Sequence, residues 1–151
     1  MEQDGIAPTA PDSRQAGSPA VGSLATAEPH LILLVEDDFM LRGSLAAVLQ
    51  SEGYRVESAA NALEALERLA RPPRPSLILL DIMLPYMDGL EFRAMQRRTP
   101  GIADIPVIVI TAVGLRPEVA QELDLQQAFF KPLDRVRLME AIRRACPPIV
   151  S

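Results

Sequence analysis

The chain has 151 residues, which is enough for one ordinary domain. Its net charge of −5 argues against nonspecific nucleic-acid binding, which needs a basic face, so no direct nucleic-acid partner is expected. The single cysteine, Cys146, excludes an internal disulfide framework and fits a reducing compartment. No apolar run approaches the roughly 20 residues that span a bilayer, and no signal peptide is recognisable, so a cytoplasmic location without a membrane partner is expected.

The first 29 residues differ in composition from the rest of the chain. They are rich in Pro, Ala, Gly, Ser and Asp and show neither a helical nor a strand period. Such a segment buries too little apolar surface to offset its ordering entropy, so residues 1–29 are predicted to be a disordered tail. Residues 30–147 are predicted to form the domain and 148–151 the C-terminal end, with no output domain.

From His30 onward, short apolar runs alternate with segments of helical period. The continuous apolarity of several runs indicates strands covered on both faces, as in a parallel sheet. Alternation of such strands with helices predicts an α/β fold with right-handed crossovers. The predicted strands are 31–35, 54–58, 77–80, 106–110 and 128–130, and the predicted helices are 40–49, 62–70, 90–98, 116–126 (the weakest pattern) and 133–145.

Polar residues collect where the predicted strands end. Glu36 and Asp37 follow the first strand, Asp81 the third, Thr111 the fourth and Lys131 the fifth. The carboxyl ends of parallel strands share one edge of the sheet, where such folds bind their ligands. Each residue taken alone has a structural explanation, such as helix capping, but the ordered set favours one common pocket.

The chemistry of this set is that of phosphoryl transfer to an aspartate. Three carboxylates repel one another unless a cation compensates, and oxygen ligands without His or Cys favour Mg²⁺. A carboxylate beside that ion can attack a phosphoryl group and hold it as an acyl phosphate. The Lys131 ammonium and the Thr111 hydroxyl would stabilise the phosphoryl oxygens.

At these residues the sequence strongly resembles the receiver domain of two-component response regulators. The resemblance extends from about residue 31 to residue 146. It implies a flavodoxin-like, doubly wound (βα)5 fold whose five-stranded parallel sheet has the order 2-1-3-4-5. The motifs that carry it are Leu33–Asp38 with Arg42, Leu79–Gly89, Val109–Ala112 and Phe130–Leu133.

The resemblance implies a role for each acidic residue. Asp81 would accept the phosphoryl group from a sensor histidine kinase or a histidine phosphotransfer protein. Asp37 and Asp81 would bind Mg²⁺, with Glu36 helping through water and Met83 supplying a backbone carbonyl. The protein would then be a signalling switch that catalyses only its own phosphorylation and dephosphorylation.

The remaining family positions concern the switch. Thr111, followed by Ala112, would approach the phosphoryl group, and Lys131 would pair with it. The Lys131–Pro132 bond is expected to be cis, which an X-Pro bond can adopt at modest cost. Phosphorylation would alter binding to an unidentified downstream protein, and the formation of a homodimer is left open.

Two features depart from the family pattern. Ala128 stands where the family carries Tyr or Phe, and Thr111 and Lys131 are only 20 positions apart. These departures predict a shortened or remodelled fourth helix, and a signal that leaves by a nonstandard route. Met83 and Val113, which would flank the hydrolytic water, are both apolar, so a long-lived phosphoaspartate is expected.

Two other functions are compatible with parts of the sequence. The first is a protein-interaction module of the same fold that no longer uses phosphorylation, which Ala128 and the short fourth-helix region favour. The second is a phosphohydrolase with an aspartyl nucleophile. That enzyme would need a second acid two residues after Asp81, where Met83 stands instead.

Overall fold

Five parallel strands form one sheet in the order β2-β1-β3-β4-β5, which confirms the predicted flavodoxin-like topology. The computed structural model describes residues 28–125 and 127–148, so the predicted disorder of residues 1–29 falls almost wholly outside the described part. No helix within that part is long and apolar enough to cross a membrane. The strands are β1 (Leu31–Val35), β2 (Arg55–Ala59), β3 (Leu77–Asp81), β4 (Val107–Thr111) and β5 (Ala128–Phe130).

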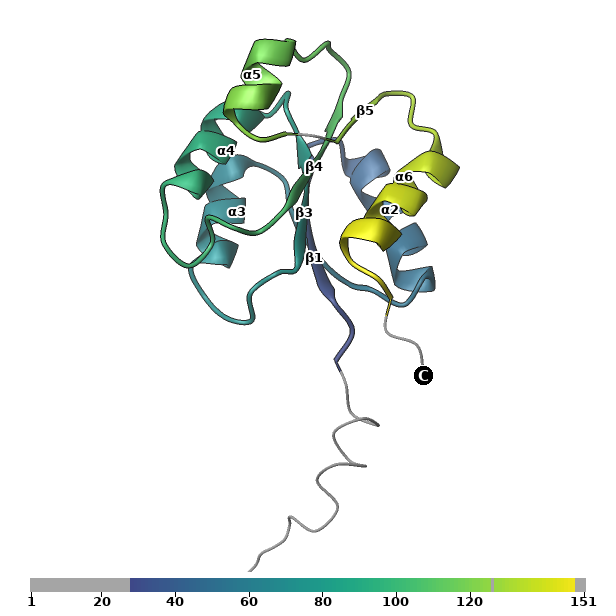
Figure 1. Ribbon diagram of the computed structural model, residues 1–151. Helices are drawn as coiled ribbons and strands as arrows, with labels where there is room; N and C mark the ends of the chain where they lie inside the picture. Colours follow the sequence, from purple (N-terminus) through teal and green to yellow (C-terminus); the bar gives the residue numbers. More distant parts are fainter. Residues whose placement is uncertain (1–27, 126, 149–151) are drawn as a thin grey trace, which may run out of the picture. The chain divides into compact units, whose positions relative to one another are not determined.

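Helices cover both faces of the sheet (Figure 1). On one face lie α2 (Phe39–Ser51) and α6 (Arg135–Ala145), and on the other lie α3 (Ala62–Leu69), α4 (Gly89–Arg97) and α5 (Pro117–Glu122). Along the described part of the chain, strands and helices alternate, as predicted.

The core follows from the apolar runs of the strands. Every residue of β1, β3 and β4 is buried. Successive side chains of a strand point to opposite faces, so Leu33 packs with Leu80 on the α3–α5 face while Leu34 packs with Leu79 on the α2–α6 face. Burying one such side chain contributes about 1.5–3 kcal/mol. This burial fixes the strands and hence the positions of the residues at their carboxyl ends.

Side-chain caps fix the points at which four of the helices begin. Asp38, Asn61, Asp88 and Asp134 each accept a hydrogen bond from a backbone N–H in the first turn of the helix that follows. Each cap contributes about 1 kcal/mol. In contrast, α5 begins at Pro117 without a side-chain cap.

Most predicted boundaries differ from the observed ones by one or two residues, and three differences have a clear physical reason. β2 begins one residue later than predicted, because the Tyr54 N–H donates to the Leu49 carbonyl at 3.2 Å in the turn after α2 and pairing with β1 starts at Arg55. The final helix begins at Arg135 rather than Leu133, because Asp134 caps it. The helix predicted over 116–126 is the six-residue α5, which ends before Asp124, a residue with a left-handed backbone (φ 53°). The fourth-helix region is thus short, as predicted.

Candidate functional site

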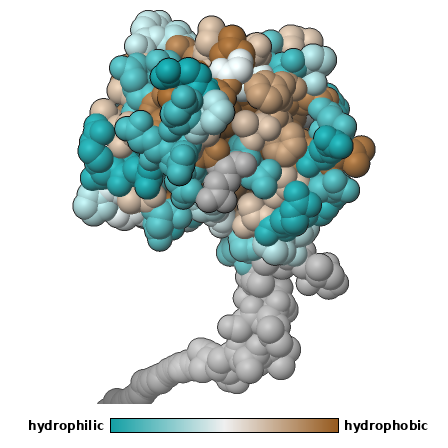
Figure 2. Space-filling view, turned by 45° about the horizontal axis from the view of Figure 1, so that its top comes forward, coloured by the Kyte–Doolittle hydropathy of each residue, from teal (hydrophilic) through white to brown (hydrophobic). Residues whose placement is uncertain are grey.

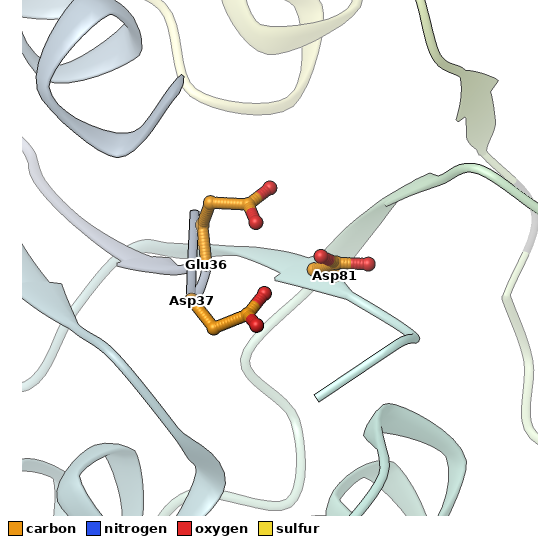
Figure 3. A group of neighbouring side chains, drawn as sticks. All are labelled: Glu36, Asp37 and Asp81. Atoms are coloured by element: carbon orange, nitrogen blue, oxygen red, sulfur yellow. The ribbon is translucent and has the colours of Figure 1, made fainter. Parts of the chain in front are cut away.

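Three carboxylates meet at the carboxyl edge of the sheet. Glu36 and Asp37 follow β1, and Asp81 ends β3, which lies beside β1 in the sheet. Figure 3 shows the side chains of Glu36 and Asp37 extending toward the side on which Asp81 lies. One carboxylate oxygen from each residue lies within 4.8 Å of the other two. Glu36 and Asp81 are buried and Asp37 is exposed, so the cluster is open to solvent on the Asp37 side.

Lys131 places a positive charge between the two buried carboxylates. Its Nζ lies 2.9 Å from Glu36 Oε1 and 3.1 Å from Asp81 Oδ2. The backbone positions it there, because the Lys131 N–H donates to the Thr111 carbonyl at 2.9 Å and extends the pairing of β5 with β4. The Lys131–Pro132 peptide bond that follows is cis, as the resemblance implied.

The other groups at Asp81 come from adjacent backbone. Asp81 Oδ1 accepts a hydrogen bond from the Met83 N–H at 2.9 Å, while the Met83 side chain is exposed. Thr111 ends the neighbouring strand β4 and is buried, and its hydroxyl oxygen accepts from the Val113 N–H at 3.1 Å. The sheet therefore brings together predicted site residues from the ends of four different strands, β1, β3, β4 and β5.

Burial dominates the electrostatics of the site. Desolvation raises the pKa of Glu36 to about 7, although the Asp38 N–H and the Lys131 ammonium partly oppose the rise. Burial alone would lower the pKa of Lys131, but the Glu36 and Asp81 carboxylates outweigh it and raise that pKa. At neutral pH the lysine is charged, and the site holds more negative than positive charge when Glu36 is ionised.

The residues present fit a magnesium ion. The 2.9 Å contact of Lys131 with Glu36 lacks hydrogen-bond geometry, and among the described residues Glu36 Oε1 has no hydrogen-bond partner. A buried oxygen left in this way is an available ligand. The cluster offers carboxylate oxygens without His or Cys, which is the donor set that a hard divalent cation such as Mg²⁺ prefers.

Arg42 holds the turn that carries the acidic pair. Its Nη1 donates to the Glu36 carbonyl at 2.7 Å and lies 3.4 Å from the Asp37 carbonyl. The guanidinium also stacks over the Phe39 ring, 5.6 Å from its centroid. Sequence reasoning placed Arg42 in the motif but gave it no role, because its partners are backbone carbonyls that no side-chain pattern reveals.

Gly89 is a site residue that the sequence placed at the end of the Leu79–Gly89 motif without a role of its own. Its N–H donates to the Ile82 carbonyl at 2.8 Å, so the start of α4 lies directly against the end of β3. A Cβ on Gly89 would lie 2.6 Å from the Asp81 carbonyl oxygen and 2.7 Å from Ile82 Cα. Only glycine permits this approach, which fixes the backbone that carries Asp81.

The predicted switch positions lie beside the site. Ala112 is exposed and directly follows Thr111. Ala128 packs against the core on the α3–α5 face, whereas Phe129 packs on the opposite face. Phe130 is 55% exposed. Where the family carries an aromatic ring, β5 therefore contributes only the methyl group of Ala128.

Fold and site together define a doubly wound α/β domain with an acidic cluster, bridged by a lysine, at the carboxyl edge of its sheet. The family described as "Response regulator receiver domain" matches residues 32–143, and this chain belongs to it. Receiver domains of two-component systems are signalling proteins that interact with histidine kinases or phosphotransfer proteins, and they generally bind Mg²⁺ at an acidic pocket.

Individual relatives agree with this assignment. The chain is 36% identical over 118 residues to sporulation initiation phosphotransferase F of Bacillus subtilis, covering 77% of this chain and 93% of that protein. It is 32% identical to the polar-differentiation response regulator DivK of Brucella anthropi, covering 76% and 94%. A crystal structure of the N-terminal domain of a receiver protein from Methanoculleus marisnigri matches with a TM-score of 0.63 and 38% identity, covering 76% of this chain and 94% of that one.

The close approach at Gly89 predicts an asymmetry between two glycine-to-alanine variants. Gly89→Ala forces the Asp81 backbone to move, so we expect unfolding free energy to fall by about 1–3 kcal/mol. Gly43→Ala, inside α2 with nothing within 4 Å of the new methyl group, should be neutral or stabilising by about 0.5–1 kcal/mol. Urea denaturation measures both, and equal effects of the two variants would contradict the steric role of Gly89.

The raised pKa of Glu36 predicts a pH dependence of stability in the absence of divalent cations. Its pKa is about 7 in the folded chain and 4.5 in the unfolded chain, so the folded state binds the proton more tightly. Glu36 therefore favours folding below pH 4.5, and this contribution is lost as the pH rises to about 7, by roughly 3 kcal/mol at most. Urea denaturation in EDTA should show this loss in the wild type and a flatter profile in Glu36→Gln. Parallel profiles would contradict it.

Proposed function

We propose that the protein is a phosphorylation-controlled switch in which Asp81 accepts a phosphoryl group from a histidine kinase or histidine phosphotransfer protein. The Lys131 ammonium between Glu36 and Asp81 is the observation that carries this proposal. It leaves Asp81 buried and next to a fixed positive charge. Such a carboxylate is a nucleophile whose product, an acyl phosphate, has a counterion already in position.

The chain's own residues would carry out the transfer as follows. One Asp81 carboxylate oxygen forms the new bond to phosphorus while the bond from phosphorus to the donor nitrogen breaks, and the electron pair returns to the imidazole. The Lys131 ammonium, 3.1 Å from Asp81 Oδ2, would neutralise a phosphoryl oxygen. The Thr111 hydroxyl can accept from the Val113 N–H and still donate its own hydrogen to a second phosphoryl oxygen.

Glu36, Asp37 and Asp81 would hold Mg²⁺, with the Met83 carbonyl as a further oxygen ligand. The ion supplies charge neutralisation, which allows an anionic phosphoryl group to approach anionic carboxylates. Asp37, the exposed member, would bind it directly, and the buried Glu36 would act through a bound water molecule.

The surface next to the site suits a protein phosphodonor. Figure 2, which brings forward the side where the strands end, shows apolar side chains exposed among hydrophilic ones. Four large apolar residues that follow β1 or β3 are strongly exposed: Phe39, Met40, Met83 and Tyr86, from 56% for Met83 to 87% for Tyr86. Apolar exposure of this kind favours contact with another protein over contact with a small solute.

Phosphorylation would then change which partner the protein binds. The downstream partner would recognise one of two surface states better than the other, because only differential affinity can couple phosphorylation to binding. A second copy of this chain would be one such partner, and the complex would then be a homodimer.

The proposal predicts which aspartate gains mass. On incubation with acetyl phosphate and Mg²⁺, intact-mass spectrometry should show one added phosphoryl group on the wild type and none on Asp81→Asn. Asp38→Asn is the matched control, because asparagine caps α2 as well as aspartate does, and it should be phosphorylated like the wild type. Asp37→Asn should need more Mg²⁺ for the same rate.

Either of two results would contradict the proposal. A mass gain that persists in Asp81→Asn places the acceptor elsewhere. No gain in the wild type at any Mg²⁺ concentration favours the protein-interaction module that no longer uses phosphorylation.

The apolar residues near the phosphoryl group predict a stable phosphoaspartate. Met83 and Val113 are both exposed next to the site, and neither side chain can orient a water molecule for attack. We expect slow loss of the added mass after the phosphodonor is removed, and faster loss from Met83→Gln, whose amide can hold the water. Equal decay in the two proteins, or rapid decay of the wild type without a phosphatase, would count against this role.

A further inference from the structure

The loops that follow α3 and α4 enclose a cavity of about 410 Å³ in the described part of the chain. Each loop leads into the next strand, so the cavity lies where the strands begin, at the edge of the sheet opposite Asp81 (Figure 1). A volume of this size is in the range of binding pockets. Most of the lining is apolar and consists of Leu66, Leu69, Ala70, Pro72, Pro100 and Ile102.

One wall of the cavity is held by a buried arginine of α3. Arg68 is 5% exposed, and it donates from Nη1 to the Arg71 carbonyl at 2.8 Å and from Nη2 to the Pro73 carbonyl at 2.7 Å. Its Nε pairs with Glu57 of β2. Breaking either carbonyl bond would leave part of a buried charge without a partner. The loop after α3 is therefore fixed to its own helix and, through that helix, to the sheet.

The other wall is held by Gln96, a fully buried residue of α4. Its Nε2 donates to the carbonyls of Ile102 and Ile105 at 2.8 and 3.0 Å, and its Oε1 accepts from Arg93 Nη1 at 2.8 Å. Both polar atoms of the side chain are thus used, and the loop after α4 is fixed as well. A cavity between two fixed walls is preorganised, which lowers the entropic cost of binding.

The charged residues that line the cavity are arginines, although the chain as a whole has a net charge of −5. Arg71 and Arg74 are both exposed, so they lie at the mouth of the cavity. Arg74 joins the two walls, because it donates to the Gly101 carbonyl at 3.0 Å and pairs with Asp104 at 2.9 Å. That ion pair is exposed and therefore weak. Among the described residues, the Arg71 guanidinium makes neither a hydrogen bond nor an ion pair.

The lining and the charge together define the ligand. An apolar group is needed to fill the cavity, and carboxylates beside it are needed to pair with the two guanidinium groups, which bind carboxylates well. A peptide with a leucine or phenylalanine between acidic residues provides both. A fatty acid has only one carboxylate, and the bodies of most small anions are polar.

We propose that this cavity binds a segment of a partner protein in which one or two large apolar side chains stand between acidic ones. The apolar side chains enter between the loops after α3 and α4, and the acidic side chains pair with Arg71 and Arg74. The partner is held at the edge of the sheet opposite the acidic cluster, so it stays bound while Asp81 is phosphorylated. None of the bonds that hold the walls involves the cluster, so we expect the same affinity before and after phosphorylation.

Selection from a random peptide library displayed on phage, with the full chain as bait, tests the proposal without knowledge of the partner. Enriched peptides should carry large apolar residues next to Asp or Glu. Labelled synthetic copies should bind in fluorescence anisotropy, and Ala70→Phe, which adds a ring to the lining from an exposed position, should abolish the binding. Enrichment of basic peptides, binding that Ala70→Phe leaves intact, or no enriched peptide at all would overturn the proposal.

A matched pair of arginine variants tests the charge at the mouth. Arg71→Gln removes the unpaired guanidinium but keeps the backbone carbonyl that Arg68 binds. Arg98→Gln makes the same change of charge at an exposed residue that does not line the cavity. The first variant should weaken peptide binding roughly tenfold, as for the loss of one charge-assisted hydrogen bond, and the second should bind like the wild type. Equal affinities would exclude the acidic ligand.

Two further measurements distinguish other outcomes. Decanoate that shifts the amide resonances of residues 66–74 and 99–102, where no acidic peptide does, would assign the cavity to a small apolar acid and overturn the proposal. Treatment with acetyl phosphate and Mg²⁺, followed by intact mass, should leave the peptide affinity unchanged, and a large change would contradict the independence of the two edges. Peptide binding itself needs no phosphoryl group, so it can be present even if the proposed function fails.

Discussion

Two carboxylates buried next to each other need a cation, and at the carboxyl edge of this sheet the Lys131 ammonium supplies it. The lysine follows the edge strand β5, whereas Glu36 and Asp81 follow or end the central strands β1 and β3. The ion pairs therefore connect the edge of the sheet to its centre. Removing the lysine would leave two buried carboxylates uncompensated, which typically costs several kcal/mol. The same arrangement keeps Asp81 beside a positive charge, so one interaction serves both the fold and the proposed chemistry.

The sequence predicts most of this arrangement because the relevant signals are local. Apolar runs that stop at Asp81 and Thr111 show where strands end, and the parallel topology then brings those ends together. Gly89 and Arg42 were given no role, because their partners are backbone atoms of other segments. Arg93 did leave a signal, since it lies on the helical face defined by buried Gly89, Phe92 and Gln96. A charged residue on a buried face indicates a polar network, but its acceptors near Leu123 depend on the tertiary fold.

Hydrogen bonds from α4 help to hold the short fourth-helix region, α5, in place. None of the six residues of α5 is buried, so its apolar contacts with the core are limited to the partly buried Ala120 and to the flanking Leu115 and Leu123. The guanidinium groups of Arg93 and Arg97 provide directional bonds instead, and they do so at one end only.

The central claim is that the phosphoryl group forms an acyl phosphate on Asp81, and borohydride reduction tests it most directly. Borohydride converts an aspartyl phosphate into homoserine, so peptide mass spectrometry after treatment with acetyl phosphate, Mg²⁺ and borohydride locates the acceptor. We expect homoserine at position 81 and at no other aspartate, with Asp37, Asp38 and Asp88 unchanged. Homoserine at any of those positions, or unmodified Asp81 in protein that has gained a phosphoryl group, would contradict it.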